Sequence, residues 1–283
     1  MQGVVYVNGQ ISAAADAKIP VFDHGFLYGE GVYETLRTYR RAPFLFAAHM
    51  ARLRRSASMI ALPVPFTDDQ LAAEIQITAA RCDGDELYIR ILLTRGIGDL
   101  SYNLGATPAP SLVIIVKPLA PFPAKNYTDG IRLSLVDIRR NHPHALNPLI
   151  KSNNLLNNAL AMQEAYRRGA DEALMLNQAG HVVECSQSNI FIVKAGRLAT
   201  PPLSAGLLPG ITREFVIEIG AFIGIETDER QLESADVLSA DEVFITGTTR
   251  EITPVNSVDE TAIATGAPGP ITLRLMAEFK NKT

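Results

Sequence analysis

Lys151 is the residue of this sequence best placed to act as a nucleophile. It lies in Asn-Pro-Leu-Ile-Lys-Ser-Asn-Asn, after two apolar residues and before the expected start of a helix. A single lysine at a helix start is usually solvated. A desolvated lysine is different, because burial disfavours the ammonium form and leaves an amine that can form a Schiff base with an aldehyde.

Glu184 is a candidate for holding a cationic group. It follows His181, Val182 and Val183 in an expected strand, and strand alternation predicts that Glu184 and Val182 share one face while Val183 and Cys185 share the other. Two interpretations are open: a charge on the solvent side of a hairpin, or a carboxylate held against a cationic heterocycle.

Two glycine-containing segments could bind a phosphate. Gly210 precedes an expected helix from Ile211, within Leu207–Arg213, and a helix start has unpaired N–H groups and the positive end of the helix dipole. The segment 247–249, Gly-Thr-Thr, follows an expected strand and offers N–H and hydroxyl donors. Most helix starts bind only water, so neither segment is decisive alone.

Arg52 is a further candidate for binding a phosphate, through its side chain rather than its backbone. It lies with Arg54 and Arg55 on an expected helix, where arginines usually form a solvated face. A planar guanidinium also binds phosphate oxygens in pairs. A nucleic-acid interface is disfavoured, because the net charge is −4 and no aromatic residues interleave the arginines.

A lysine, a carboxylate and two phosphate-binding segments together fit pyridoxal 5′-phosphate. Its aldehyde needs the amine, and a glutamate beside the ring nitrogen favours the pyridinium form that withdraws electrons from the substrate. No GxSxG, Walker A or GxGxxG motif is present. His142 and His144 have no third ligand at a suitable spacing, so no metal site is expected, and His24 and His49 are interpreted as structural.

The composition is that of a globular cytoplasmic protein. Of 283 residues, 47% are hydrophobic and 20% are charged, and the two cysteines cannot form a disulfide framework. No apolar run approaches the roughly 20 residues that a membrane span needs. The start of the chain also does not resemble a signal peptide.

The elements that position these residues give an α+β fold. In the first half, Asn8-Gly9 predicts a hairpin, and Thr67 with Gln70 predicts a capping box. Strands are expected at 4–7, 10–13, 32–39, 87–94 and 111–117, and helices at 48–61 and from Thr67 onward.

The second half follows a proline-rich segment, 118–123, that is the expected interdomain linker. Ser152 is the predicted cap of a helix that ends near Arg168 at Gly169. Further strands are expected at 131–137, 173–176, 181–185, 190–194 and 243–246, and a helix at 211–219.

The sequence resembles the class IV aminotransferases, which are pyridoxal-phosphate enzymes of fold type IV. The resemblance runs from Val21–Gly29 to Glu251–Val255 and is most specific in Lys151–Asn158. It implies a small α+β domain (1–118), a linker (119–124) and a larger pseudo-barrel domain (125–283). It also implies a homodimer that binds small-molecule amino acids and 2-oxo acids, with no nucleic-acid or membrane partner.

The resemblance implies roles at matching positions. Lys151 would carry the cofactor as a Schiff base and move the proton, Glu184 would pair with the pyridine nitrogen, and Leu207 would pack on the ring. The residues that it implies for the phosphate are Arg52, Gly210, Ile211, Thr212 and Thr248.

The subgroup of class IV aminotransferases that the sequence resembles indicates the expected substrate. Branched-chain L-amino-acid transaminases have a Tyr-Ile-Arg strand, here Tyr88 to Arg90, and Arg90 would receive the distal carboxylate of glutamate or 2-oxoglutarate. The other side chains implied for the substrate are Tyr28, Tyr33 and Thr249. Leu155 and Thr249 depart from the pattern, which usually has tyrosine and alanine there.

Alternatives remain open. D-amino-acid or (R)-amine transaminases share the fold, but the arginine and histidine that trap the carboxylate in D-amino-acid transaminases are absent from 97–103. Aminodeoxychorismate lyases often have threonine where this chain has Glu34. A non-catalytic scaffold with the same fold is the alternative outside enzymes, because fold alone does not fix function.

Overall fold

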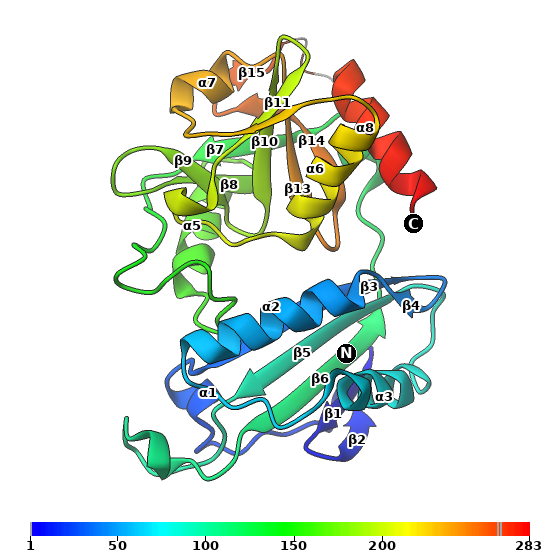
Figure 1. Cartoon of the computed structure of the whole chain (residues 1–283), viewed down its shortest axis with the longest axis vertical. Helices are drawn as coiled ribbons and strands as arrows, with labels where there is room; N and C mark the ends of the chain where they lie inside the picture. The colour runs from blue at the N-terminus through cyan, green and yellow to red at the C-terminus, as the bar shows by residue number, and fades with distance from the viewer. Residues whose placement is uncertain (1, 265, 267) are drawn as a thin grey trace. The chain divides into compact units, whose positions relative to one another are not determined.

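A computed structural model describes residues 2–264, 266 and 268–283, which divide into two compact units (Figure 1). Unit 1 contains the described residues up to Ala120 together with Ile150–Asn154. Unit 2 contains Pro121–Leu149 and the described residues from Leu155 onward. The boundary after Ala120 lies within the expected linker, and the short segment 150–154 belongs to unit 1 although the residues on both sides of it belong to unit 2.

Unit 1 is built on a six-stranded antiparallel sheet. The predicted hairpin at Asn8-Gly9 and the capping box of Thr67 and Gln70 are both present. The strand order is β2-β1-β6-β5-β3-β4. The elements are β1 (Val4–Val7), β2 (Gln10–Ala13), α1 (His24–Leu27), β3 (Gly31–Tyr39), β4 (Ala42–Pro43), α2 (Phe46–Met59), α3 (Asp68–Ala79), β5 (Leu87–Thr94) and β6 (Ser111–Pro118).

Helices α2 and α3 cover one face of this sheet, and Figure 1 shows α2 lying across it. Alternate residues of β3 and β5, such as Leu36 and Ile89, pack with Met50 and Leu53 of α2 in one apolar core. The intervening residues of the same strands are half-buried on the opposite face. The sheet therefore separates a helix-covered core from a second, half-buried face.

The segment 150–154 pairs with the first residues of β3 through backbone hydrogen bonds. Tyr33 N donates to Lys151 O at 2.9 Å, and Asn153 N donates to Gly31 O at 2.9 Å. The predicted cap at Ser152 is therefore wrong: Ser152 forms a strand bridge with Val32, and the helix begins four residues later. Pairing with β3 uses the backbone of this segment and prevents it from joining the helix.

Unit 2 is built on a nine-stranded mixed sheet, with Gly169 ending α5 as predicted. The order is β12-β11-β10-β13-β14-β7-β8-β9, with β15 paired to β14. The elements are α4 (Ala124–Thr128), β7 (Ile131–Leu135), α5 (Leu156–Arg167), β8 (Glu172–Leu176), β9 (Val182–Cys185), β10 (Asn189–Lys194), β11 (Arg197–Thr200), α6 (Ile211–Phe222), β12 (Thr227–Glu229), α7 (Ser234–Leu238), β13 (Glu242–Gly247), β14 (Glu251–Val258), β15 (Thr261–Ala262) and α8 (Pro270–Asn281).

The sheet of unit 2 closes on itself. Val182 in β9, at one end of the strand order, bonds through its N–H to Leu232 O at 2.8 Å. Leu232 follows β12, which is the strand at the other end. Closure encloses an apolar core that includes Leu174, Ile192 and Ile245. The α+β class with a larger pseudo-barrel unit is therefore confirmed.

Strand β9 contains a bulge beside Glu184. Met175 pairs with Glu184 but the next residue, Leu176, pairs with Val182, so one residue of β9 is extra. The predicted alternation is wrong for this reason: Val182 packs in the same core as Cys185, whereas Val183 packs elsewhere. Across the described residues, no helix is long and apolar enough to span a membrane.

Candidate active site

Lys151 is held by its backbone from two sides. Its carbonyl accepts from Tyr33 of β3, and its N–H donates to Ser56 Oγ of α2 at 3.1 Å. Its Nζ atom lies 4.6 Å from the centroid of the Tyr33 ring. An ammonium group over an aromatic face is attracted by the ring electrons. The Lys151 side chain therefore starts from a fixed backbone position, and its amine lies beside one aromatic ring.

The predicted substrate residues of unit 1 gather on the half-buried face of the sheet. The guanidinium carbon of Arg90 lies 4.1 Å from the same Tyr33 ring centroid, and Tyr88 precedes Arg90 by two residues on that face. Tyr28, which follows α1, instead contacts Tyr102 in a tilted arrangement, with ring centroids 5.1 Å apart. The face thus places an amine and a guanidinium around one tyrosine.

Arg52 is buried in a charge cluster rather than on a solvated face. Its Nε donates to Glu34 Oε1 at 2.7 Å and its Nη2 donates to Glu34 Oε2 at 2.8 Å. His49 Nδ1 lies 2.7 Å from Glu34 Oε2, and it must donate because a carboxylate only accepts. The bidentate pair fixes the plane of the Arg52 guanidinium.

The cluster changes the ionisation of its members. Burial opposes the charged form of Glu34, but Arg52 and the hydrogen bonds from Arg52 and His49 outweigh it and lower its pKa to about 2. Burial also lowers the pKa of His49, and the charges of Arg52 and Lys151 act in the same direction. At neutral pH the cluster therefore contains a carboxylate, a guanidinium and a neutral imidazole.

Glu184 is buried in unit 2, which excludes the interpretation as a solvent-side charge. Only 5% of its surface is exposed. Arg140 Nε donates to Oε1 at 2.8 Å, while Asn189 Nδ2 and Leu208 N donate to Oε2 at 3.2 and 3.1 Å. These donors offset the cost of burying the charge and fix the plane of the carboxylate.

The segment 207–210 connects Glu184 to helix α6. Leu207 is fully buried and packs with Val183 and Ala205. Gly210 is the N-cap of α6, and a Cβ atom there would lie 1.9 Å from Asn189 Oδ1, so any other residue would force the Asn189 side chain to move. A glycine N-cap also has no side chain to bind the first N–H groups of the helix. Those groups, beginning at Ile211 and Thr212, are available to an anion.

The turn Gly247–Arg250 is tied to a buried acid. Arg250 N donates to Gly247 O at 3.2 Å, which closes the turn that contains Thr248 and Thr249. Arg250 Nη1 donates at 2.8 Å to Glu172 Oε2, and Glu172 is fully buried. The other oxygen of Glu172 accepts from Ser186 Oγ. One carboxylate therefore connects this turn to the residues that follow Glu184.

Sequence reasoning missed three of these side chains. The sequence assigned no role to Arg140, Glu172 or Arg250, because each acts through a partner that is at least 14 residues away in the chain, as with Ser186 and Glu172. The only signal was a glutamate placed in the apolar run of β8. A charged residue at a buried strand position indicates a partner but does not name it.

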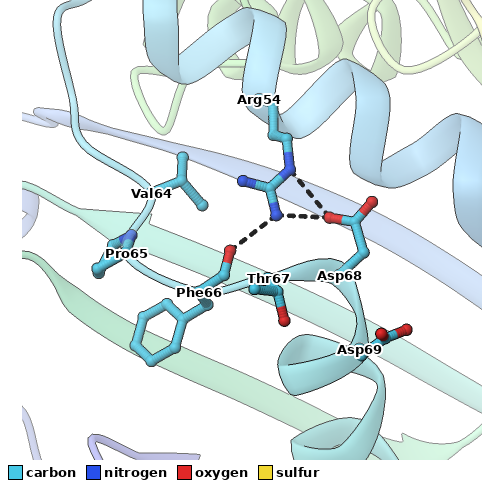
Figure 2. Close-up of a pocket in the computed structure, with 7 residues that line it drawn as sticks. All are labelled: Arg54, Val64, Pro65, Phe66, Thr67, Asp68 and Asp69. Carbon is cyan, nitrogen blue, oxygen red and sulfur yellow. Dashed lines mark hydrogen bonds and ion pairs between the residues drawn. The ribbon is translucent and has the colours of Figure 1, made fainter.

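A surface pocket lies away from these residues (Figure 2). It is lined by Arg54 and 64–69, at the start of α3. Arg54 donates to Phe66 O at 2.7 Å and through Nε to Asp68 Oδ1 at 2.9 Å, so its charge holds the loop to α2. None of the predicted site residues lines this pocket. In the described part of the chain, no group of three acidic, histidine or cysteine side chains is placed to hold a metal ion.

The family model for amino-transferase class IV matches residues 31–258 of this chain. The match includes Glu34, Lys151, Glu184 and the turn at 247–250. The chain is a class IV aminotransferase. The family assignment and the transferase activity that the sequence predicted are therefore confirmed.

Relatives of this aminotransferase match it over nearly its whole length. A Methanocaldococcus jannaschii protein, provisionally named a branched-chain-amino-acid aminotransferase, is 40% identical over 277 residues (98% of this chain, 95% of that protein). The D-alanine aminotransferase of Bacillus licheniformis is 32% identical over 280 residues (98% and 96%). The branched-chain amino acid aminotransferase structure from Escherichia coli superposes with a TM-score of 0.91 at 32% identity, covering 99% of this chain and 94% of that one.

Proposed function

We propose that this aminotransferase uses pyridoxal 5′-phosphate to move an amino group between a branched-chain L-amino acid and 2-oxoglutarate. The observation that carries the proposal is the pair of Lys151 Nζ and Arg90 guanidinium at one Tyr33 ring, because it combines a Schiff-base amine with a carboxylate-binding cation. A further branched-chain amino acid aminotransferase, 31% identical to this chain, has been crystallised with N-(5′-phosphopyridoxyl)-L-glutamate and with 4-methylvaleric acid, one acidic and one aliphatic ligand.

The donor set of the chain fits this cofactor. Glu184 offers a buried carboxylate whose position is fixed by three donors. The first N–H groups of α6 follow a glycine that Asn189 packs against, and the fixed guanidinium of Arg52 is suited to phosphate. Carboxylate, amine, guanidinium and helix start are the groups that the heterocycle, aldehyde and phosphate require.

When bound, pyridoxal 5′-phosphate supplies an aldehyde carbon and an electron-withdrawing ring. Lys151 would hold the group through its Nζ atom and would take the proton of the substrate α carbon there. Glu184 would favour the cationic form of the ring nitrogen, and Leu207 would pack on the ring. The residues proposed to hold the phosphate are Arg52, Gly210, Ile211, Thr212 and Thr248.

The substrate residues have complementary chemistry. Arg90 binds the distal carboxylate of glutamate or 2-oxoglutarate in the half-reaction that uses them. The other residues proposed to contact the substrate are Tyr28, Tyr33, Tyr88 and Thr249. A site that accepts both an aliphatic chain and a carboxylate needs a cation that binds the carboxylate but does not contact the aliphatic chain. Arg90, which packs against the Tyr33 ring, satisfies this need.

A D-amino-acid specificity is the second candidate, because the D-alanine aminotransferase of Bacillus licheniformis matches 98% of the chain at 32% identity. Incubation of the loaded enzyme with L-leucine, L-glutamate or D-alanine separates the two. Bleaching of the cofactor absorbance by L-leucine and L-glutamate supports the proposal, and bleaching by D-alanine alone supports the second candidate. The homodimer and the cytoplasmic location stay predictions.

Lys151→Ala tests the chemistry. We expect the half-reaction with L-leucine to slow by at least about 10⁴-fold, because the covalent and proton-transfer roles of one amine vanish together. Stopped-flow absorbance with pre-loaded cofactor measures this rate. Turnover of Lys151→Ala at the wild-type rate would refute the proposal.

Arg90→Ala tests the substrate. We expect kcat/KM for L-glutamate to fall about 100-fold and that for L-leucine to fall less than about 5-fold, because only glutamate has a distal carboxylate. Arg37→Ala is the matched control, since Arg37 is an arginine of β3 on the same half-buried face of the sheet as Arg90. Equal losses for both substrates would remove Arg90 from the distal-carboxylate role.

A further inference from the structure

The two-residue segment Ser188–Asn189 touches both glycines of the proposed phosphate site. Asn189 Oδ1 would lie 1.9 Å from a Cβ atom at Gly210, the N-cap of α6. Ser188 Oγ would lie 3.4 Å from a Cβ atom at Gly247, which ends β13 and precedes Thr248. Consecutive residues of one segment thus connect the two sources of phosphate donors within unit 2.

The two side chains differ in their hydrogen bonds. The Asn189 amide donates to Glu184 Oε2 at 3.2 Å and to Leu208 O at 3.0 Å. Ser188 is 6% exposed, and its Oγ has no hydrogen-bond partner within the described residues. A buried hydroxyl without a partner destabilises a fold, and so its presence calls for a ligand.

The backbone keeps the Ser188 hydroxyl in place. Cys185 N donates to Ser188 O at 2.7 Å, and Asn189 pairs with Thr246 in the ladder between β10 and β13. The neighbouring Ser186 hydroxyl is already bonded to Glu172. The segment is therefore fixed on both sides of Ser188. Its unpaired hydroxyl indicates a ligand rather than a mobile side chain.

We propose that the Ser188 hydroxyl is a further ligand of the cofactor phosphate, to which it donates a hydrogen bond between the α6 start and the Gly247–Arg250 turn. A phosphate dianion offers several acceptor oxygens, and a hydroxyl donor adds to backbone N–H groups without adding charge. This inference rests on the proposed function, since it assumes that the anion is the phosphate of pyridoxal 5′-phosphate.

Ser188→Ala and Ser188→Thr test the inference in the cofactor-free protein. Dissociation constants are measured by absorbance titration with pyridoxal 5′-phosphate and with pyridoxal, which lacks the phosphate. We expect Ser188→Ala to weaken pyridoxal 5′-phosphate about tenfold, the usual size for a hydrogen bond to a charged group, and to leave pyridoxal unchanged. Ser188→Thr keeps the hydroxyl and retains affinity within about threefold.

Thr227→Val is the matched control. Thr227 Oγ1 is likewise buried without a partner within the described residues, but it lies on β12, 3.7 Å from the position of a Cβ atom at Gly220, nine residues beyond the start of α6. We expect its affinity for pyridoxal 5′-phosphate to equal that of the wild type. The melting temperature of each cofactor-free variant shows whether folding is intact, and Ser188→Ala should not lower it.

The outcomes separate the inference from the function. Wild-type affinity in Ser188→Ala, equal weakening of pyridoxal, or equal weakening by Thr227→Val would each overturn the role of Ser188 while leaving the enzyme's function in place. Failure of the wild-type protein to bind pyridoxal 5′-phosphate would instead overturn the proposed function itself.

Discussion

Two buried glutamates, one in each unit, are paired with an arginine in different ways. Glu34 is fully buried and both of its oxygens accept from Arg52, with His49 as a further donor. Glu184 accepts from Arg140 Nε through Oε1, and its Oε2 accepts from an amide and a backbone N–H. Glu34 is thus held mainly by one cation, while Glu184 is held by a guanidinium, a side-chain amide and a backbone N–H.

The difference indicates opposite roles. A bidentate pair fixes the plane of the guanidinium, so Glu34 orients Arg52. Bonds from several directions fix the plane of the carboxylate, so Arg140, Asn189 and Leu208 orient Glu184. Under the proposed function, Glu34 positions a cation for the cofactor phosphate, and Glu184 is itself the group that contacts the cofactor ring.

Glu184→Gln is expected to have the largest effect on catalysis. The amide keeps the shape but cannot hold a cationic ring nitrogen, so we expect kcat of the cofactor-saturated enzyme to fall by about 10³-fold. Steady-state kinetics at saturating cofactor measures it.

Glu242→Gln is the control for that variant. Glu242 is also a buried glutamate of unit 2, but it accepts from Ile271 N and Thr272 N at the start of α8. We expect a loss of stability with unchanged kcat. A similar fall in kcat for both variants would show that any buried glutamate of unit 2 matters equally, against the role assigned to Glu184.

Glu34→Gln is expected to act mainly on stability and on cofactor affinity. It leaves the buried Arg52 without its counter-charge, which lowers the free energy of unfolding by about 3 kcal/mol. Urea denaturation measures this loss, and cofactor titration measures the affinity. We expect kcat at saturating cofactor to stay within about fivefold of the wild type. A large fall in kcat would contradict the distinction between the two glutamates.

The pH dependence of stability gives the third and smallest effect. The folded-state pKa of Glu34, about 2, lies below its unfolded value of 4.5, so this carboxylate contributes stability above pH 4.5 and loses it as the pH falls towards 2. The contribution is about 3 kcal/mol at neutral pH. The lowered pKa of His49 acts in the same direction, with stability lost as the pH falls below 6.5.

Urea denaturation of wild type and Glu34→Gln at pH 7 and pH 3 isolates this term. The difference between the two proteins should shrink by about half at pH 3. A constant difference would mean that the charge of Glu34 does not stabilise the folded state.

Local patterns predicted much of the fold. The Asn8-Gly9 hairpin, the Thr67 capping box and the stop at Gly169 depend on neighbouring residues only, and all three are present. Strand β14 had no such signal, because Pro254 cannot donate to a ladder. Its pairing with β7 begins only at Val255, one residue after the proline.

The parts of the site that sequence did not predict depend on distant partners. Ser152 has the residue type of a helix cap, yet β3 pairs with its segment and the helix starts at Leu156. Alternation around Glu184 fails because of a bulge, which is set by pairing with β8. Arg140 could be assigned to Glu184 only once the fold had joined residues that are 44 positions apart.

Reduction of the cofactor-loaded protein with borohydride shows whether Lys151 carries the cofactor. Borohydride converts a Schiff base into a stable secondary amine, and mass spectrometry of a protease digest locates it. We expect loss of the yellow colour and one phosphopyridoxyl group on the peptide that contains Lys151. Modification of another lysine, or of none while the colour persists, would refute the role of Lys151.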